Sequence, residues 1–208
     1  MNFIVLASGR GSRLNELTKN KPKCLTVVRN KKTILDYITL NFDKSDNAII
    51  STGYKANLIE KHLAGRSINY VRNKNFLNTN MVESLMLCKK KLRNGNFVII
   101  YGDIYFDQKI IKKLKKIKGN VIAVNPNWLH SWKKRYSTLK KIREDAEDLI
   151  VSKGKIISIG NRIRKKLPKF QYMGILKIEQ KTFNKLEKFY KKINNKKISL
   201  THFIDKTI

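Results

Sequence analysis

The chain has 208 residues, enough for one well-packed domain and too few for two ordinary ones. A hydrophobic fraction of 41%, with ten Gly and three Pro, excludes a collagen, a low-complexity linker and a disordered tail. Forty-six Lys and Arg against fifteen Asp and Glu leave a net charge of +31, which favours anionic partners such as nucleotides or nucleic acid.

Short apolar runs alternate with segments of helical spacing along the first 125 residues. The runs predict strands at 2–7, 48–52, 68–71, 97–101 and 121–124. The spacing predicts helices around 34–42, 58–63, 81–92 and 110–117. This alternation is typical of an α/β layered fold with a mostly parallel sheet.

The rhythm changes after residue 125. Apolar runs on either side of Lys153-Gly154 predict a hairpin within 149–159, and 171–178 reads as a further strand. Helical spacing returns at 182–193 and 199–208. We therefore expect one domain over residues 1–208 with a small β-rich insertion.

The cysteines and the hydropathy of the chain indicate in which cell compartment the protein works. Cys24 and Cys88 are far apart and form no CxxC motif, which argues against a disulfide framework and a structural zinc site. The apolar run 3–7 is too short for a signal peptide, and no segment reaches the roughly 18 apolar residues of a membrane span. We expect a cytoplasmic protein without a membrane span.

The first strand runs into the loop Gly9-Arg-Gly-Ser-Arg13. At the carboxyl edge of a parallel sheet, the N–H groups of such a loop can bind phosphate oxygens. The loop is not a Walker A motif and lacks the third glycine of a dinucleotide fingerprint, so a plain tight turn is the alternative. Lys21-Pro-Lys23 follows, and this turn can bring a lysine ammonium group back to the same phosphates.

The stretch Leu6-Ala-Ser-Gly-Arg-Gly-Ser-Arg-Leu14, followed by Lys21-Pro-Lys-Cys-Leu25, resembles the signature of nucleotidyltransferases that activate sugar 1-phosphates and phosphocholine. Ser8 stands where that signature usually has a small Ala or Gly. The resemblance implies a Rossmann-like three-layer nucleotidyltransferase domain, with a nucleotide-binding half at 1–125 and an acceptor-binding half at 126–208. It implies catalytic roles for Lys23 and Arg13, and nucleotide contacts from Leu6, Ala7, Ser8, Gly9, Gly11, Ser12, Arg13 and Lys23.

Two further stretches extend this nucleotide site. Gly53 and Tyr54 end a predicted strand and are candidate nucleotide contacts, with a strand-terminating turn as the alternative. Asn80 and Ser84 lie four residues apart on one helical face and resemble the N-x-x-x-S-L stretch of cytidylyltransferases. Simple N-capping by Asn80 is the alternative.

Asp103 follows a predicted strand at the same sheet edge as the glycine loop, where a magnesium ligand for a triphosphate belongs. Capping of the next helix is the alternative, although Asp107 is better placed for that cap. Mg²⁺ is the expected cofactor, with Mn²⁺ as a substitute. Members of the family also carry a second metal-binding acid on a later strand, in a W-x-E-I-D type motif that is absent up to Ile208.

Asp205 is not a convincing substitute for that acid, so we expect the acceptor half to be truncated or shortened at its C-terminus. Loss of a late strand would leave a sheet edge for a partner subunit to cover, which makes a homo-oligomer an expectation.

The segment after residue 125 resembles the insertion of the small-phosphate cytidylyltransferases. Trp128 and Trp132 could form an aromatic face for a quaternary ammonium group, and Arg135 could hold the acceptor phosphate. Tyr172 matches the family strand beside the acceptor and is a second candidate wall. Packing of the two tryptophans onto the sheet is the alternative.

The reaction implied is in-line attack of an acceptor phosphate oxygen on the α-phosphorus of a nucleoside triphosphate, with release of pyrophosphate and no protein nucleophile. We expect CTP and a small phosphorylated acceptor: phosphocholine, phosphoethanolamine, aminoethylphosphonate or a phosphorylated amide. Such products serve as precursors of cell-surface polysaccharide or lipid. A sugar-1-phosphate nucleotidylyltransferase using UTP or dTTP is the second hypothesis. A basic nucleic-acid-binding module is the remote one, because the lysine runs are interleaved with helical apolar residues.

Overall fold

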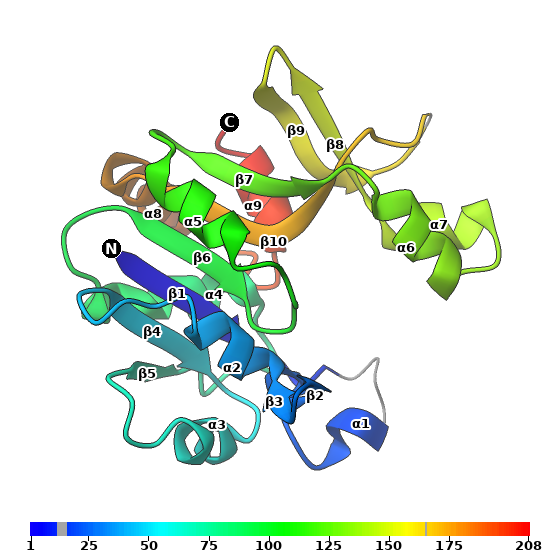
Figure 1. The fold of residues 1–208 in the computed structure, drawn as a ribbon. Helices are drawn as coiled ribbons and strands as arrows, with labels where there is room; N and C mark the ends of the chain where they lie inside the picture. Colours follow the sequence, from blue (N-terminus) through cyan, green and yellow to red (C-terminus); the bar gives the residue numbers. More distant parts are fainter. Residues whose placement is uncertain (12–15, 165) are drawn as a thin grey trace.

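The computed structural model describes residues 1–11, 16–164 and 166–208, and a six-stranded sheet lies at its centre (Figure 1). The strand order is β5-β4-β1-β6-β10-β7. The strands are β1 (Asn2–Ala7), β4 (Asn47–Thr52), β5 (Asn69–Arg72), β6 (Phe97–Tyr101), β7 (Val121–Asn125) and β10 (Gln171–Ile178). All the strands predicted for this sheet are therefore present.

The sheet is mostly parallel, as predicted. β1 pairs in parallel with β4 on one side and β6 on the other, so that Leu6 lies opposite both Ser51 and Tyr101. β4 and β5 are also parallel. β10 lies between β6 and β7 in the described sheet and runs antiparallel to both.

Helices cover both faces of the sheet (Figure 1). Phe3 and Val5 of β1 pack into one core cluster, whereas Ile4 and Leu6 pack into the other, because successive side chains of a strand point to opposite faces. The first cluster includes residues of α2 (Ile34–Thr39), α3 (Ala56–His62) and α5 (Lys109–Lys116). The second includes residues of α4 (Met81–Leu87), α8 (Gln180–Lys192) and α9 (Leu200–Asp205). This is the expected three-layer arrangement.

Polar side chains fix where helices begin. Thr33 and Asp36 form a capping box at the start of α2, and Asp36 also accepts a hydrogen bond from His62 at 3.0 Å. Burial acts to raise the pKa of Asp36, but the hydrogen bonds from Thr33 and His62 outweigh it and lower that pKa. α4 is shorter than predicted, because it ends at Leu87 and continues as the 3₁₀ helix η3 (Cys88–Lys91).

The insertion after β7 consists of α6 (Trp128–Arg135), α7 (Leu139–Asp145) and the hairpin of β8 (Glu147–Ser152) and β9 (Lys155–Arg162). Lys153 and Gly154 have φ angles of 47° and 74°, as a two-residue hairpin turn of the favoured hand requires. The predicted hairpin is confirmed, and it projects away from the sheet (Figure 1).

Short elements link β1 to α2: α1 (Glu16–Lys19), the 3₁₀ helix η2 (Lys23–Leu25), β2 (Val27–Arg29) and β3 (Lys32–Thr33). These elements are too short for a hydrophobic pattern to predict them from the sequence. Within the part of the chain that the structure describes, no helix is both long and apolar enough for a membrane crossing.

Candidate active site

A cleft of about 340 Å³ lies where β1 and β6 end. β1 has parallel neighbours on both sides, so the connections to them diverge, and this is the place where α/β sheets bind ligands. The structure brings most of the predicted nucleotide contacts to this cleft, namely Leu6, Ala7, Ser8, Gly9, Gly11, Lys23, Asn80, Ser84 and Asp103.

Other predicted contacts lie elsewhere. Ser12 and Arg13 fall outside the described residues. Gly53 and Tyr54 are not among the residues that line the cleft. A Cβ at Gly53 would lie 2.5 Å from the Ser8 carbonyl oxygen, and the Tyr54 N–H donates to the same oxygen at 3.0 Å. In this structure both residues therefore contact the segment that follows β1, at the carbonyl oxygen of Ser8.

Two glycines let the loops at the cleft come close together. Gly11 has a φ of 69°, and a Cβ there would lie 3.2 Å from the Cβ of Lys23. A Cβ at Gly102 would lie 2.8 Å from the Cβ of Ala7, and the Gly102 N–H donates to the Leu6 carbonyl at 2.9 Å. Gly102 was not predicted, although its place directly before Asp103 was a usable signal.

Lys23 and Asp103 meet across the cleft. The Lys23 Nζ lies 2.7 Å from Asp103 Oδ2, and these side chains are 33% and 42% exposed. Asp107, not Asp103, accepts the Lys109 N–H at the start of α5, at 2.8 Å. The cleft therefore holds a cation suited to phosphate and a carboxylate suited to a metal ion, each neutralising the other.

The donor set fits a metal that is bound mainly through a nucleotide. No group of three or more His, Cys, Asp or Glu that could hold a metal occurs among residues 1–11, 16–164 and 166–208. Mg²⁺ is commonly held by one or two carboxylates together with substrate phosphates and water, and Asp103 offers one such carboxylate. Asp205 accepts hydrogen bonds from the Ile159 N–H at 2.8 Å and from Asn161 at 3.2 Å, so it joins α9 to β9.

Several lining residues were not predicted as site residues: Cys24, Asn73, Phe76, Thr79, Met81 and Tyr101. Burial raises the pKa of the Cys24 thiol to about 12, which keeps it protonated and unsuited to act as a nucleophile. Asn80 lines the cleft and also caps α4, since its side chain accepts the Met81 N–H at 2.7 Å. Both roles considered for Asn80 are thus compatible.

Tyr172 lies behind the cleft wall. Its ring packs edge-on against Tyr101, with centroids 5.7 Å apart, and Tyr101 lines the cleft. The Tyr172 hydroxyl is buried and has no hydrogen-bond partner among the described residues. Gly174 leaves room for the Tyr101 ring, because a Cβ there would lie 2.9 Å from it.

The aromatic residues of the insertion pack within it. Trp128 is 2% exposed, and its Nε1–H donates to the Pro168 carbonyl at 3.0 Å. Trp132 donates to the Asp145 carboxylate at 2.9 Å, and the Arg135 guanidinium lies 5.7 Å from the Trp132 ring centroid. None of the three predicted contacts lines the cleft, and Trp128 offers no free ring face to a ligand. These contacts agree with the alternative in which the two tryptophans serve to pack the insertion and do not form a face for a ligand.

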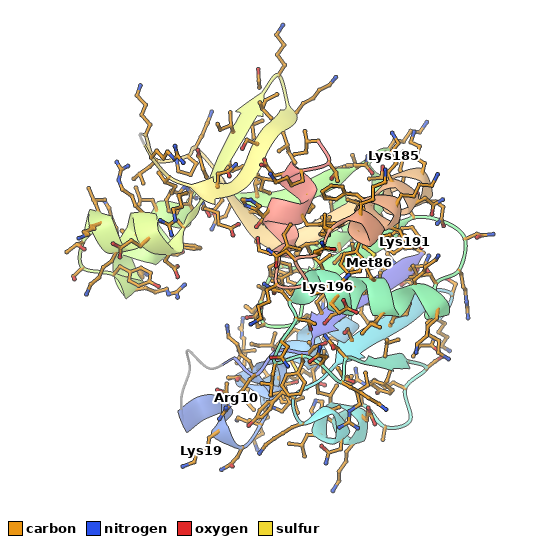
Figure 2. All side chains as sticks on the ribbon, turned by 180° about the vertical axis from the view of Figure 1, so that it is seen from behind. Arg10, Lys19, Met86, Lys185, Lys191 and Lys196 are labelled. Atoms are coloured by element: carbon orange, nitrogen blue, oxygen red, sulfur yellow. The ribbon has the colours of Figure 1, made fainter. Side chains whose placement is uncertain are left out.

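The positive charge is spread over the molecule (Figure 2). Arg10 belongs to the glycine loop and Lys19 ends α1, whereas Lys185, Lys191 and Lys196 lie on or after α8. Among the described residues, one lysine lines the cleft itself, Lys23. The net charge of +31 therefore reflects the whole surface of the protein.

Comparisons with known proteins agree with this geometry. The profile of the MobA-like NTP transferase domain matches residues 3–152. CTP:phosphoglutamine cytidylyltransferase of Campylobacter jejuni is 30% identical over 204 residues, which cover 93% of this chain and 79% of that protein.

Solved structures show the same fold. An inositol-1-phosphate CTP transferase from T. maritima superposes with a TM-score of 0.73 at 22% identity, over 99% of this chain and 80% of that one. CTP:phosphocholine cytidylyltransferase from Streptococcus pneumoniae gives a TM-score of 0.71 at 21% identity, over 99% and 84% of the two chains. The chain belongs to the MobA-like NTP transferase family, and it is a nucleotidyltransferase.

Proposed function

We propose that the protein transfers CMP from CTP to a small phosphorylated acceptor and releases pyrophosphate. The observation that carries this proposal is the Lys23–Asp103 pair, 2.7 Å apart in a nucleotide-binding cleft at the ends of β1 and β6. Similarity to CTP:phosphoglutamine cytidylyltransferase over nearly the whole chain supports the choice of CTP. A phosphorylated amide is therefore the first acceptor to test, ahead of phosphocholine, phosphoethanolamine and aminoethylphosphonate.

The chemistry needs alignment and charge neutralisation. An acceptor phosphate oxygen forms a bond to the α-phosphorus while the bond from that phosphorus to the pyrophosphate oxygen breaks. Lys23 places its ammonium group where negative charge gathers, and the N–H groups of the Gly9–Gly11 loop face the phosphates. We assign Arg13 to the same task. Asp103 would hold Mg²⁺, or Mn²⁺ in its place, and the bound metal would supply positive charge to the phosphates.

We further propose that residues 1–125 bind the nucleotide and residues 126–208 bind the acceptor. Every described residue that lines the cleft comes from the first half. Tyr172 of β10 packs against the ring of Tyr101, which lines the cleft, and this contact supports a role for β10 in shaping the acceptor side. Trp132 and Arg135 lie on α6 and remain candidates for acceptor contacts.

The cytoplasm is the proposed compartment, because both cysteines are free and buried, as reducing conditions allow.

Pyrophosphate release tests the proposal. The purified protein is given each of CTP, UTP, dTTP, ATP and GTP with Mg²⁺, against phosphorylated amides, phosphocholine, phosphoethanolamine, aminoethylphosphonate and hexose 1-phosphates. We expect release with CTP and one small phosphorylated acceptor. Release with UTP or dTTP and a hexose 1-phosphate would replace the proposal with the sugar-nucleotide alternative. No release with any pair would reject it.

A further inference from the structure

A second groove lies along the hairpin of β8 and β9, apart from the cleft at the ends of β1 and β6. Its volume is about 1150 Å³, and its described walls come from the two strands of the hairpin, the residues that follow β9, and His202 of α9. No described residue lines both this groove and the cleft. The hairpin projects away from the sheet (Figure 1), so the groove belongs to an arm of the molecule that the nucleotide site does not use.

The groove has an apolar strip along β8. Leu149, Ile150 and Val151 line it together with Leu167 and Phe170. Leu149 is 5% exposed, whereas its neighbours Ile150 and Val151 are 47% and 37% exposed. Two consecutive aliphatic side chains on a projecting arm therefore face water, and covering them would be favourable.

Cations surround this apolar strip. Six exposed lysines and arginines lie on the hairpin or directly after it: Lys153, Lys155, Arg162, Arg164, Lys166 and Lys169. The last four line the groove. None of the six forms an ion pair with a carboxylate of the described chain. Of the two acids at the start of β8, Glu147 accepts the Thr201 hydroxyl at 3.0 Å and Asp148 lines the groove. The surface is thus both apolar and strongly positive.

Contacts with α9 fix the hairpin in place. Asp205 accepts the Ile159 N–H at 2.8 Å and a side-chain N–H of Asn161 at 3.2 Å. Gly160 has a φ of 85° and lets β9 approach α9 closely, because a Cβ there would lie 2.7 Å from the Cβ of Thr201. The apolar strip and the cations on β9 are therefore already ordered, so a partner that covers them pays little conformational entropy.

The charge decides which partner fits this surface. A second copy bound through the same surface would bring the same cations face to face, and like charges at an interface repel. Nucleic acid would pair with the cations but would give the aliphatic side chains no apolar surface. A bilayer with anionic lipids offers phosphates to the cations and an apolar layer to Ile150 and Val151. Long lysine and arginine stems let the charged groups stay at the headgroups while the strip inserts.

We propose that the β8–β9 hairpin, with residues 162–164 and 166–170, attaches the protein to the surface of a bilayer that contains anionic lipids. Ile150 and Val151 enter the boundary between headgroups and acyl chains, and the six cations contact lipid phosphates. The proposal goes beyond the transfer of CMP and is independent of it, because the described residues that it uses do not line the cleft.

Flotation with lipid vesicles tests the proposal on the full chain at near-physiological ionic strength. The wild type should float with vesicles of equal parts phosphatidylcholine and phosphatidylglycerol, and not with phosphatidylcholine alone. Ile150→Thr with Val151→Thr should weaken this binding about tenfold, because threonine keeps the β-branch and loses apolar area. A second variant replaces four groove cations with glutamine: Arg162, Arg164, Lys166 and Lys169. It should bind about 25-fold more weakly or worse, since each cation near an anionic bilayer contributes about fivefold.

Two controls match these variants. The charge control replaces four exposed lysines of α5 and α8 with glutamine: Lys112, Lys113, Lys185 and Lys188. It removes the same net charge from other surfaces and should weaken binding less than about fivefold. Leu139→Thr is the apolar control, because Leu139 on α7 is 55% exposed and does not line the groove. It should leave binding unchanged.

Each outcome decides for or against the groove. Equal losses in the two charge variants would show attraction by net charge alone, and undiminished binding of the Ile150→Thr, Val151→Thr variant would exclude insertion of the strip. Either result overturns the proposal. If the wild type ignores the anionic vesicles and binds a single-stranded oligonucleotide through the groove cations, the partner is nucleic acid instead. Thermal unfolding shows that each variant is folded, and if one is not, the other decides. Pyrophosphate release without vesicle binding would reject this inference and leave the proposed function intact.

Discussion

Replacement of Lys23 should separate catalysis from stability. Lys23→Ala removes the ammonium group that lies 2.7 Å from Asp103 Oδ2 and next to the glycine loop. Loss of one preorganised donor at a developing charge typically lowers turnover about 10²–10³-fold, or about 2.7–4 kcal/mol. We expect a reduction of that size in the rate of pyrophosphate release.

The effect on folding should be much smaller. The two side chains are 33% and 42% exposed, and solvent-exposed ion pairs contribute about 0.2–1 kcal/mol. For a chain of this length, 1 kcal/mol corresponds to a shift in Tm of about 2–4 °C. The loss of activity should therefore exceed the loss of stability about threefold or more in free energy.

The assay compares Lys23→Ala with Lys185→Ala, a matched removal of an exposed lysine on α8. Initial rates at saturating CTP and acceptor give kcat, and thermal unfolding gives Tm. Lys185→Ala should change neither. Unchanged kcat in Lys23→Ala would remove this lysine from the mechanism, and a Tm fall large enough to unfold the enzyme under assay conditions would show a structural role instead.

Three further results are expected. Asp103→Asn should reduce the gain in CTP affinity that Mg²⁺ provides, while calorimetry in EDTA shows little change; an unaltered metal dependence would contradict the assignment. Gly53→Ala should lower the free energy of unfolding in urea by about 1–3 kcal/mol, because the new Cβ would lie 2.5 Å from the Ser8 carbonyl. Gly9→Ala, whose Cβ would meet nothing within 4 Å, is its control, and equal losses would refute the steric argument. Asp36→Asn should cost about 1 kcal/mol of stability at neutral pH, the usual net contribution of a hydrogen bond, because the amide lacks the charge that strengthens the bonds from Thr33 and His62. The folded-state pKa of this carboxyl is lowered, so its contribution is complete above its ordinary pKa of about 4 and is lost as the pH falls through the folded value. Urea unfolding at pH 7 and pH 3 should show the difference between wild type and variant shrinking at pH 3.

The sequence was most informative where a signal is local. β1 is buried on both faces, so its apolar run has no interruption, and the turn at Lys153-Gly154 needs two left-handed residues. One non-local prediction also succeeded: Asp103 lies at the same sheet edge as the glycine loop, as the rule that parallel strands end at one edge requires.

The features that were missed depend on register between distant elements. Ser8, Ser51 and Ser84 come from three elements, and their hydroxyls meet only because β1 and β4 pair with Leu6 opposite Ser51. Asn73 lies directly after β5 with no motif around it. The tryptophans of α6 carry the same spacing whether they face a ligand or a core, so periodicity alone could not choose between the two.

The insertion of β10 between β6 and β7 has a consequence for synthesis on the ribosome. β7 has no other strand partner in the described sheet, so after residue 125 emerges it must wait for β10, roughly 50 residues later. At typical translation rates of about 5–20 residues per second, that delay is about 3–10 s. During this time the apolar edges of β6 and β7 are open to pairing with other chains, which makes the nascent protein a candidate client for chaperones. Residues 1–125 contain all the described residues that line the cleft, yet they cannot complete the sheet without β10.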